Sequence, residues 1–385
     1  MRVAINLRNA NLMITDGHGE SMRSLARALV ADAANHQVDL LFDAPSRVSG
    51  LQRQSAQIHV LSPFRIGNRL LSRVLNADPW YRARVPLASA WRRSDAYLQS
   101  AHEPVPLSSG PKHVAFVHDV AFMRPGAQRY YEPDTRAYLD RWTATNVHRA
   151  DRIVAVSNWV RDEVVRIYGI EPNRVDVAPH GVDSQRFVAR SDMAAVGATL
   201  RRLRVDMPYV LFLGTLQPRK NLGTLARAHA IARDRGMPHK LVLAGGRGWR
   251  YDDVEQELDA TPNKDLQLPG IIDAADLPSL LTGASALVTV ALDEGFGMPV
   301  LEAMASGVPV VAANQGGLAN AVGDAGMKVN PLDEDAIADA LVRVTSDPHL
   351  RNDLRTRGLA RASELTWTRT AQHVWKSLER ACASC

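Results

Sequence analysis

The chain has 385 residues, a net charge of +5 and a hydrophobic fraction of 46%. This length exceeds what one ordinary core accommodates, so we expect about two domains. The near-average composition excludes a disordered chain or a coiled coil. No segment approaches the roughly 20 apolar residues of a membrane span. The N-terminus lacks the apolar run of a signal peptide, so we expect a cytoplasmic protein.

The first half of the chain alternates strand-like and helix-like segments. A strand over residues 2–7 precedes a loop with Gly17 and Gly19, and a helix begins near Ser21. Apolar patterning in the same half predicts strands at 38–42, 113–117, 152–156 and 175–178, and helices at 135–149 and 157–168. This alternation is typical of βα units.

The second half repeats the alternation after a candidate linker at 188–207. Its patterning predicts strands at 209–213, 240–244, 286–291 and 308–312, with helices from 222, at 252–258, from 299 and near 335–344. Repeated βα units predict parallel sheets covered by helices on both faces. We therefore expect an α/β fold of two Rossmann-like domains, 1–190 and 191–365, and a C-terminal helix and tail, 366–385, that pack back on the N-terminal domain.

An acidic segment, DEGFGMPVLEAMASGVP at 293–309, follows a predicted strand and opens a helix. Ligands bind at the carboxyl ends of strands in open α/β sheets, and helix N-terminal amides attract phosphates. Glu294 in the loop and Glu302 in the helix can face one small volume, where carboxylates accept hydrogen bonds from sugar hydroxyls. The alternative is a helix whose acidic residues only complement its dipole.

A basic pair precedes the first predicted helix of the second domain. Arg219 and Lys220 follow the strand at 209–213, and Asn221 suits the N-cap of the next helix. A guanidinium and an ammonium at the carboxyl edge of a sheet would neutralise a diphosphate. The alternative is an ordinary basic turn. This interpretation is less favoured because the acidic segment belongs to the same domain.

Both clusters resemble the motifs of one enzyme family. Glu294 and Glu302 in EGFGMPVLEAMASGVPVV, together with FLGTLQPRKNL, resemble the retaining family 4 glycosyltransferases of the GT-B fold. Three further segments stand in the order that this family shows in its N-terminal domain, namely FVHDVAFMRPG, RADRIVAVSNWVRDEV and VAPHGVD. The resemblance covers nearly the whole chain and implies that the two parallel sheets face each other across a cleft.

The resemblance implies a role for each residue of the donor side. Arg219 and Lys220 would bind the donor diphosphate and stabilise the leaving charge, Glu294 would hold the donor sugar, and Glu302 would hold the ribose. The backbone amides that would touch sugar and phosphate are those of Gly295, Phe296, Gly297 and Met298.

On the other domain the resemblance assigns a histidine and two glycines. His118 would approach the donor sugar, and Gly17 and Gly19 would offer amides to the pyrophosphate. Such enzymes retain the anomeric configuration, with the leaving phosphate helping to deprotonate the acceptor. That chemistry requires no metal, and the one D-x-D, Asp333-Glu334-Asp335, begins a predicted helix and fits dipole-complementing acids better than a metal site.

The donor and acceptor follow from the resemblance alone. QPRKN and HDVAFMRPG are most similar to bacterial mannosyltransferases of surface-polysaccharide assembly, which favours GDP-mannose as co-substrate, with a UDP-sugar as the alternative. The acceptor would be a saccharide or a polyprenyl-diphosphate-linked sugar. No other cofactor and no nucleic acid partner are expected.

Positive charge is concentrated in the N-terminal half, which has 25 Lys and Arg against 18 Asp and Glu over residues 1–190. The segment 64–93 alone contains seven arginines, with Trp80, Tyr81 and Trp91 among them. Cations beside amphipathic aromatics suit an anionic membrane surface, so we expect this segment to dock peripherally on the inner face of the cytoplasmic membrane. The alternative is a solvated charged face. The cysteines at 382 and 385 suggest a solvated tail.

Three other functions fit parts of the sequence. A nicotinamide dehydrogenase would use Gly17 and Gly19 with Asp43 on the ribose, but Met22 stands where its third glycine belongs. A nucleotide-sugar epimerase or hydrolase could share the two-domain fold. A binding module without activity is disfavoured because the cations and both glutamates are present.

Overall fold

The computed structural model describes residues 1–8, 17–43, 56–61, 78, 80–88, 91, 93–106, 110–190, 192–261 and 263–383. The chain forms two compact units. Unit 1 comprises Met1–Met123, Pro133–His180 and Trp367–Cys385, and unit 2 comprises Arg124–Glu132 and Gly181–Thr366. The acceptor-side and donor-side roles that the sequence assigns to the two domains remain predictions.

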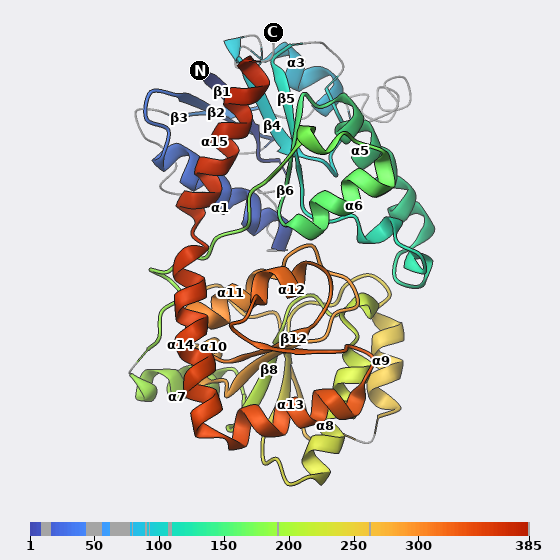
Figure 1. Ribbon diagram of the computed structural model, residues 1–385, viewed down its shortest axis with the longest axis vertical. Helices are drawn as coiled ribbons and strands as arrows, with labels where there is room; N and C mark the ends of the chain where they lie inside the picture. Colours follow the sequence, from blue (N-terminus) through green and yellow to red (C-terminus); the bar gives the residue numbers. More distant parts are fainter. Residues whose placement is uncertain are drawn as a thin grey trace. The chain divides into compact units, whose positions relative to one another are not determined.

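Unit 1 is built on a parallel sheet that contains, in the described residues, seven strands in the order β3-β2-β1-β4-β5-β6-β7 (Figure 1). The strands are β1 (Arg2–Asn6), β2 (Gln37–Phe42), β3 (Ala56–Val60), β4 (Ala96–Ser100), β5 (Lys112–Val117), β6 (Arg152–Ala155) and β7 (Val175–Val177). The helices are α1 (Gly17–Ala31), α3 (Val85–Leu87), α5 (Pro133–Arg149), α6 (Asn158–Tyr168) and α15 (Trp367–Ala383). All strand pairs are parallel, so the carboxyl ends meet at one edge.

Helix boundaries in unit 1 differ from the predictions at one site. The predicted loop with Gly17 and Gly19 is wrong, because both glycines lie in the first turn of α1. Glu20 in that turn complements the positive end of the helix dipole and favours the earlier start. The N-cap of α6 is confirmed, since the Ser157 side chain accepts a hydrogen bond from the Val160 amide at 3.1 Å.

Helix α15 returns the chain to unit 1, where it packs against α1 and the strands β4 to β7 (Figure 1). Its residues Ala371, Val374 and Leu378 are fully buried, and their spacing of three and four places them on one helix face. The expectation that Cys382 lies in a solvated tail is wrong. This residue belongs to α15, and its Sγ lies 3.5 Å from the Met1 sulfur. Cys385 lies outside the described residues.

Unit 2 contains, in its described part, a parallel sheet of six strands in the order β10-β9-β8-β11-β12-β13. The strands are β8 (Tyr209–Leu213), β9 (Lys240–Ala244), β10 (Leu266–Gly270), β11 (Ala286–Thr289), β12 (Val310–Ala313) and β13 (Met327–Val329). The helices are α7 (Met193–Arg202), α8 (Leu222–Asp234), α9 (Tyr251–Asp259), α10 (Leu277–Gly283), α11 (Met298–Ala305), α12 (Gly316–Val322), α13 (Glu334–Ser346) and α14 (Pro348–Glu364).

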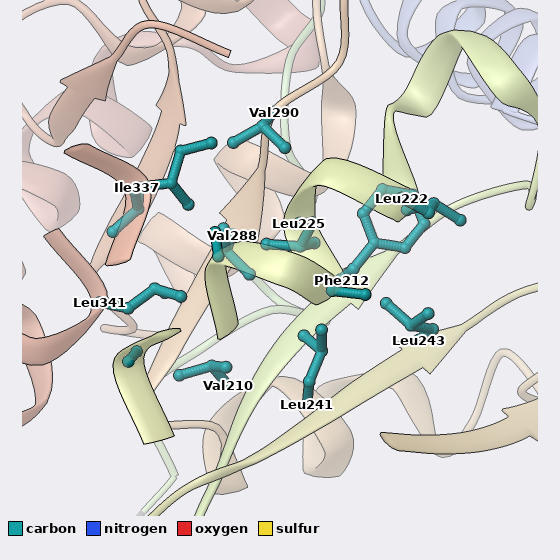
Figure 2. Packing of buried hydrophobic residues seen from close by; sticks show 14 of the residues in the cluster. Val210, Phe212, Leu222, Leu225, Leu241, Leu243, Val288, Val290, Ile337 and Leu341 are labelled. Carbon is teal, nitrogen blue, oxygen red and sulfur yellow. The ribbon is translucent and has the colours of Figure 1, made fainter. Parts of the chain in front are cut away.

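The hydrophobic core of unit 2 lies between its sheet and the helices that cover it. Figure 2 shows apolar side chains of β8, β9 and β11 packed against those of α8 and α13, including Val210, Leu225, Val288 and Leu341. These four residues are fully buried. The strands read as continuous apolar runs, as expected for a parallel sheet covered on both faces.

The predicted linker at 188–207 is wrong, because it contains helix α7. Asp192 caps this helix by accepting a hydrogen bond from the Ala195 amide at 3.0 Å. Val196 and Leu200 are buried one turn apart, and α7 packs against α10. Over the part of the chain that the structure describes, no helix is both long and apolar enough to cross a membrane.

Candidate functional site

Two neighbouring strands of unit 2 bring the basic pair and the acidic loop together. Strand β8 leads into a short 3₁₀ turn over Pro218–Lys220, and β11 leads into the loop before α11. Since β8 and β11 pair in parallel, their carboxyl ends meet at the same edge of the sheet. The backbone joins both loops, because the Leu292 amide donates to the Arg219 carbonyl at 2.9 Å.

Arg219, Lys220 and Glu294 form a buried ion cluster at this edge, which we call the donor cluster. Arg219 Nη1 donates to Glu294 Oε2 at 2.9 Å and to the Asp293 carbonyl at 2.8 Å. Lys220 Nζ donates to the same Glu294 oxygen. The three side chains are 11%, 13% and 19% exposed. The cluster therefore contains two cations and one anion, with an excess of positive charge.

The protonation state of Glu294 follows from two opposed effects. Burial by itself raises the pKa of a carboxyl group, because it disfavours the charged form. The charges of Lys220 and Arg219, and their hydrogen bonds, outweigh burial and lower the pKa of Glu294 to about 2. Glu294 is thus a carboxylate at any physiological pH, able to accept hydrogen bonds from hydroxyl groups.

The loop after Glu294 is held by close backbone contacts. The Gly317 amide donates to the Glu294 carbonyl at 2.8 Å, and a side chain at Gly317 would collide with the Gly295 carbonyl. Gly297, at φ +98°, precedes the first residue of α11 in a left-handed conformation that favours glycine. Phe296 is buried, and Met298 begins α11. These contacts fix the amides near the helix N-terminus.

Two predicted residues have surroundings that the sequence did not indicate. Glu302 lies half-buried in the second turn of α11, one turn beyond the loop. Asn221 occupies the N-cap position of α8 but makes no capping bond with its side chain. Its Nδ2 instead donates to the carbonyls of Val290, at 3.2 Å, and Pro331, at 2.7 Å.

The carboxyl edge of the unit 1 sheet carries a group of histidines, which we call the histidine cluster. His118 follows β5 and lies beside His18, with ring centroids 4.1 Å apart. His180, after β7, is 5.6 Å from His118, and His102, after β4, is 6.3 Å from it. His102 Nε2 donates to the Asp119 carbonyl at 3.1 Å.

Two histidines of this cluster, His118 and His180, have lowered pKa values. His118 is 8% exposed, and its Nε2 has no hydrogen-bond partner among the described residues. Burial lowers the pKa of His118 well below its usual value, and the neighbouring His18, His180 and His102 lower it further. Burial also lowers the pKa of His180, to about 3. These two rings therefore offer uncharged donors and acceptors.

The sequence analysis missed three of these four histidines. His18, His102 and His180 each follow the carboxyl end of a predicted or observed parallel strand, as His118 does. That shared position was the available signal, because such ends meet at one sheet edge. Gly17 and Gly19 lie on either side of His18 in the first turn of α1, so they share its position.

The structure shows the surroundings of two further acidic residues, Asp333 and Asp43. Asp333 caps α13 by accepting a hydrogen bond from the Ala336 amide at 2.9 Å. Within the described ranges, no three His, Cys, Asp or Glu side chains form a group that could hold a metal ion. Asp43, the ribose ligand of the dehydrogenase alternative, accepts a hydrogen bond from Arg8 Nε at 3.0 Å.

The aromatic part of the membrane-docking expectation is wrong. Trp80, Tyr81 and Trp91 are 1%, 4% and 6% exposed and pack in a core cluster with Tyr97. Aromatic rings buried in this way cannot insert into a headgroup layer. Residues 64–77 of the segment lie outside the described residues.

Comparisons with known proteins agree with this architecture. The Glycosyl transferases group 1 family matches residues 201–361, and Glycosyltransferase Family 4 matches residues 15–186. The chain is 30% identical over 293 residues to an O-antigen chain mannosyltransferase B from Escherichia coli, covering 74% of this chain and 76% of that protein.

Two solved structures share the fold over essentially their whole length. A sucrose-phosphate synthase from Thermosynechococcus elongatus matches with a TM-score of 0.73 and 20% identity, covering 100% of both chains. The Anabaena protein HepE in complex with UDP-glucose matches with a TM-score of 0.70 and 16% identity, covering 99% of this chain and 100% of that one. The chain therefore belongs to glycosyltransferase family 4, the retaining enzymes of the GT-B fold that use a nucleotide sugar.

Proposed function

We propose that this enzyme transfers mannose from GDP-mannose to a saccharide acceptor, carried on polyprenyl diphosphate, in polysaccharide biosynthesis. The observation that carries the proposal is the donor cluster, in which Arg219 and Lys220 converge on Glu294 at the carboxyl end of β11. The 30% identity to an O-antigen chain mannosyltransferase supports mannose as the sugar and polysaccharide assembly as the process.

The donor diphosphate would exchange partners with Glu294. Before the donor binds, the carboxylate neutralises part of the charge of Arg219 and Lys220. A diphosphate carries more negative charge than one carboxylate and matches the guanidinium fork, so it competes for both cations. Positive charge then faces the phosphates, where the leaving group gains negative charge during transfer.

Glu294 would then be released toward the sugar. Its low pKa keeps it ionised, so it accepts hydrogen bonds from sugar hydroxyls without a preceding proton loss. Glu302 in α11 would hold the ribose, and the amides of Gly295 to Met298 would contact sugar and phosphate. In unit 1, neutral His118 would hydrogen-bond the donor sugar, and Gly17 and Gly19 would offer amides to the pyrophosphate.

The proposed acceptor is attached to a membrane lipid. A polyprenyl-diphosphate carrier places the acceptor at a membrane surface, where basic residues of the segment 64–93 would be attracted to anionic lipid. Arg93 is exposed in unit 1 and available for such attraction. Because Trp80, Tyr81 and Trp91 are buried, an attraction through Arg93 would be electrostatic and weak.

A transfer assay with labelled donors tests the proposal. The full chain is incubated with labelled GDP-mannose or UDP-glucose and a polyprenyl-diphosphate-linked oligosaccharide. We expect mannose in the lipid-linked product, attached with the anomeric configuration of the donor, and no conversion of the donor when acceptor is omitted. Transfer from UDP-glucose with none from GDP-mannose would refute the choice of donor. Conversion without acceptor would indicate an epimerase or hydrolase.

UDP-glucose is the second candidate donor. The structural neighbour HepE was solved with UDP-glucose, although its 16% identity to this chain supports a shared fold and not a shared donor. The same assay separates the two donors, because both are supplied at equal concentration to the same acceptor.

A further inference from the structure

A second cavity of unit 2 lies at the opposite sheet edge from the donor cluster. Its volume is about 450 Å³, and its lining includes Ser285 and Pro309, which directly precede β11 and β12. Glu294 instead follows β11. Since β11 and β12 pair in parallel, their amino ends share one edge. The length of the strands therefore separates this cavity, which we call the amino-edge cavity, from the donor cluster.

Three arginines, Arg190, Arg351 and Arg355, line the amino-edge cavity, and its lining contains no Asp or Glu. Among the described residues, none of the three forms an ion pair with a carboxylate. Their neighbours on α14 behave differently, because Arg357 pairs with Asp353 and Arg361 with Glu364.

The spacing of two of these arginines costs helix stability. Arg351 and Arg355 stand four residues apart on α14, where like charges face each other and repel. An anion bound between the two guanidinium groups would offset this repulsion. A guanidinium also forms paired hydrogen bonds with phosphate oxygens, which an ammonium cannot match.

Neutral hydrogen-bonding groups complete the lining. Ser306 is 4% exposed and Thr282 is half-buried, and over the described chain the hydroxyl of each lacks a hydrogen-bond partner. Both residues line the cavity, as does Asn352. Both hydroxyl oxygens are shielded from solvent, so a ligand in the cavity would contact the Asn352 amide and the arginine side chains instead.

Arg355 also contacts the helix that begins at the donor loop. A Cβ atom placed on Gly307 would lie 3.2 Å from Arg355 Nε, so the guanidinium lies against the end of α11. A cation there complements the negative end of the helix dipole. That explanation covers Arg355 alone and leaves Arg190 and Arg351 without a role.

We propose that the amino-edge cavity binds a small soluble phosphomonoester, of the size of a sugar phosphate. Three arginines in a lining that contains no Asp or Glu suit one dianionic phosphate, and the Asn352 amide suits a hydroxylated body. The volume falls within the range of about 300–1,000 Å³ that small-molecule sites occupy. This site is independent of the donor chemistry and does not depend on the identity of the transferred sugar.

Calorimetric titration of the full chain with glucose 6-phosphate tests the proposal, with GDP or UDP present in excess to fill the donor site. We expect saturable binding at one site that the nucleotide does not abolish. The double variant R351Q/R355Q should bind at least about ten-fold more weakly, because it loses two charge-assisted contacts. The matched control is R357Q, which removes an ion-paired arginine of the same helix and should leave the affinity unchanged.

Three results would overturn the proposal. They are no saturable binding at millimolar probe, equal affinity in the double variant, or competition by the nucleotide. If vesicles that contain phosphatidic acid bind through Arg351 and Arg355 while glucose 6-phosphate does not, the ligand is a lipid headgroup and the soluble assignment is wrong. Thermal unfolding of each variant checks its fold, and the single variants R351Q and R355Q replace the double variant if that one does not fold.

Discussion

The donor cluster of unit 2 and the histidine cluster of unit 1 occupy equivalent positions, at the carboxyl edges of parallel sheets. They differ in ionisation, because Glu294 is charged and His118 is neutral. In the donor cluster Glu294 and two cations keep one another ionised, with the pKa of Glu294 at about 2. In the histidine cluster burial lowers the pKa of His118 and the neighbouring histidines lower it further, so this ring stays neutral. A buried site thus keeps fixed charges only where opposite charges are paired.

Removing both cations should have the largest effect. In R219A/K220A the leaving phosphate loses its two positive partners, and Glu294 is left buried without them. We expect kcat to fall by on the order of 10²–10³ or more, as for other groups that stabilise transition-state charge. Steady-state transfer at saturating donor measures this. The control R227A breaks an exposed ion pair with Glu334 in the same unit and should change kcat less than two-fold. If the kcat of the double variant lies within a few-fold of the wild-type value, the two cations do not stabilise the leaving group.

The contribution of the histidine cluster to the transfer rate should depend on pH. Because the pKa of His118 lies well below its usual value, the ring stays neutral from pH 8 down through pH 6, and a rate that needs the neutral ring should fall only in more acidic solution. In H18N the electrostatic effect of His18, which lowers the pKa of His118, is absent, so the pKa of His118 should rise toward its usual value. We expect the acid limb of kcat/KM to move to higher pH by a fraction of a unit. Superimposable profiles for H18N and wild type would contradict coupling between the two rings.

A second buried carboxyl group sharpens the comparison with Glu294. Glu103 in unit 1 is 2% exposed and accepts its hydrogen bond from the Asn6 amide. Burial raises its pKa to about 8, and the Arg8 charge and the Asn6 bond only partly oppose this.

The raised pKa makes the stability of unit 1 depend on pH. The folded state keeps the Glu103 proton longer than the unfolded state, so stability is lost as the pH rises from about 4.5 to 8, at up to about 1.4 kcal/mol per unit. E103Q removes this loss, so its unfolding temperature should exceed that of wild type by on the order of 10 °C at pH 8.5 and match it at pH 5. Thermal unfolding of both proteins across that pH range measures this difference. If their unfolding temperatures change in parallel with pH, Glu103 is not the titrating group.

The smallest expected effect concerns the membrane. Because Trp80, Tyr81 and Trp91 are buried, we expect the described part of this segment to attract anionic vesicles through charge. Salt screens charges over about 10 Å at 0.1 M and about 3 Å at 1 M. We expect weak co-sedimentation with anionic vesicles at low salt, none at high salt and none with neutral vesicles. Binding that persists at 1 M salt would mean that apolar side chains insert after all.

Element types were predictable from sequence where apolar periodicity was strong. The strand at 209–213 and the helix capped by Ser157 match β8 and α6, because each follows from local pattern and cap chemistry. Helix α7 was missed because only Val196 and Leu200 mark its buried face, and β4 was missed because its buried Gln99 breaks the apolar run. The secondary structure of both segments depends on packing against residues that are distant in the sequence.

The site was predictable in its composition and not in its pairing. The motif placed Arg219, Lys220 and Glu294 on one sheet edge, but whether the cations face solvent or the carboxylate depends on how two loops from different strands meet. The histidine cluster depends in the same way on four separate strand ends, so no single motif contains it.

Nucleotide binding to E294Q tests the partner exchange in the donor cluster most directly. Calorimetry compares GDP, UDP and the corresponding nucleotide sugars on wild type, E294Q and R219A/K220A. If the diphosphate displaces Glu294 from Arg219 and Lys220, E294Q should bind the nucleoside diphosphate as tightly as wild type or more tightly, and should lose the additional affinity for the nucleotide sugar. R219A/K220A should bind both ligands at least about ten-fold more weakly. A loss of nucleoside diphosphate affinity in E294Q as large as that in R219A/K220A would contradict the exchange.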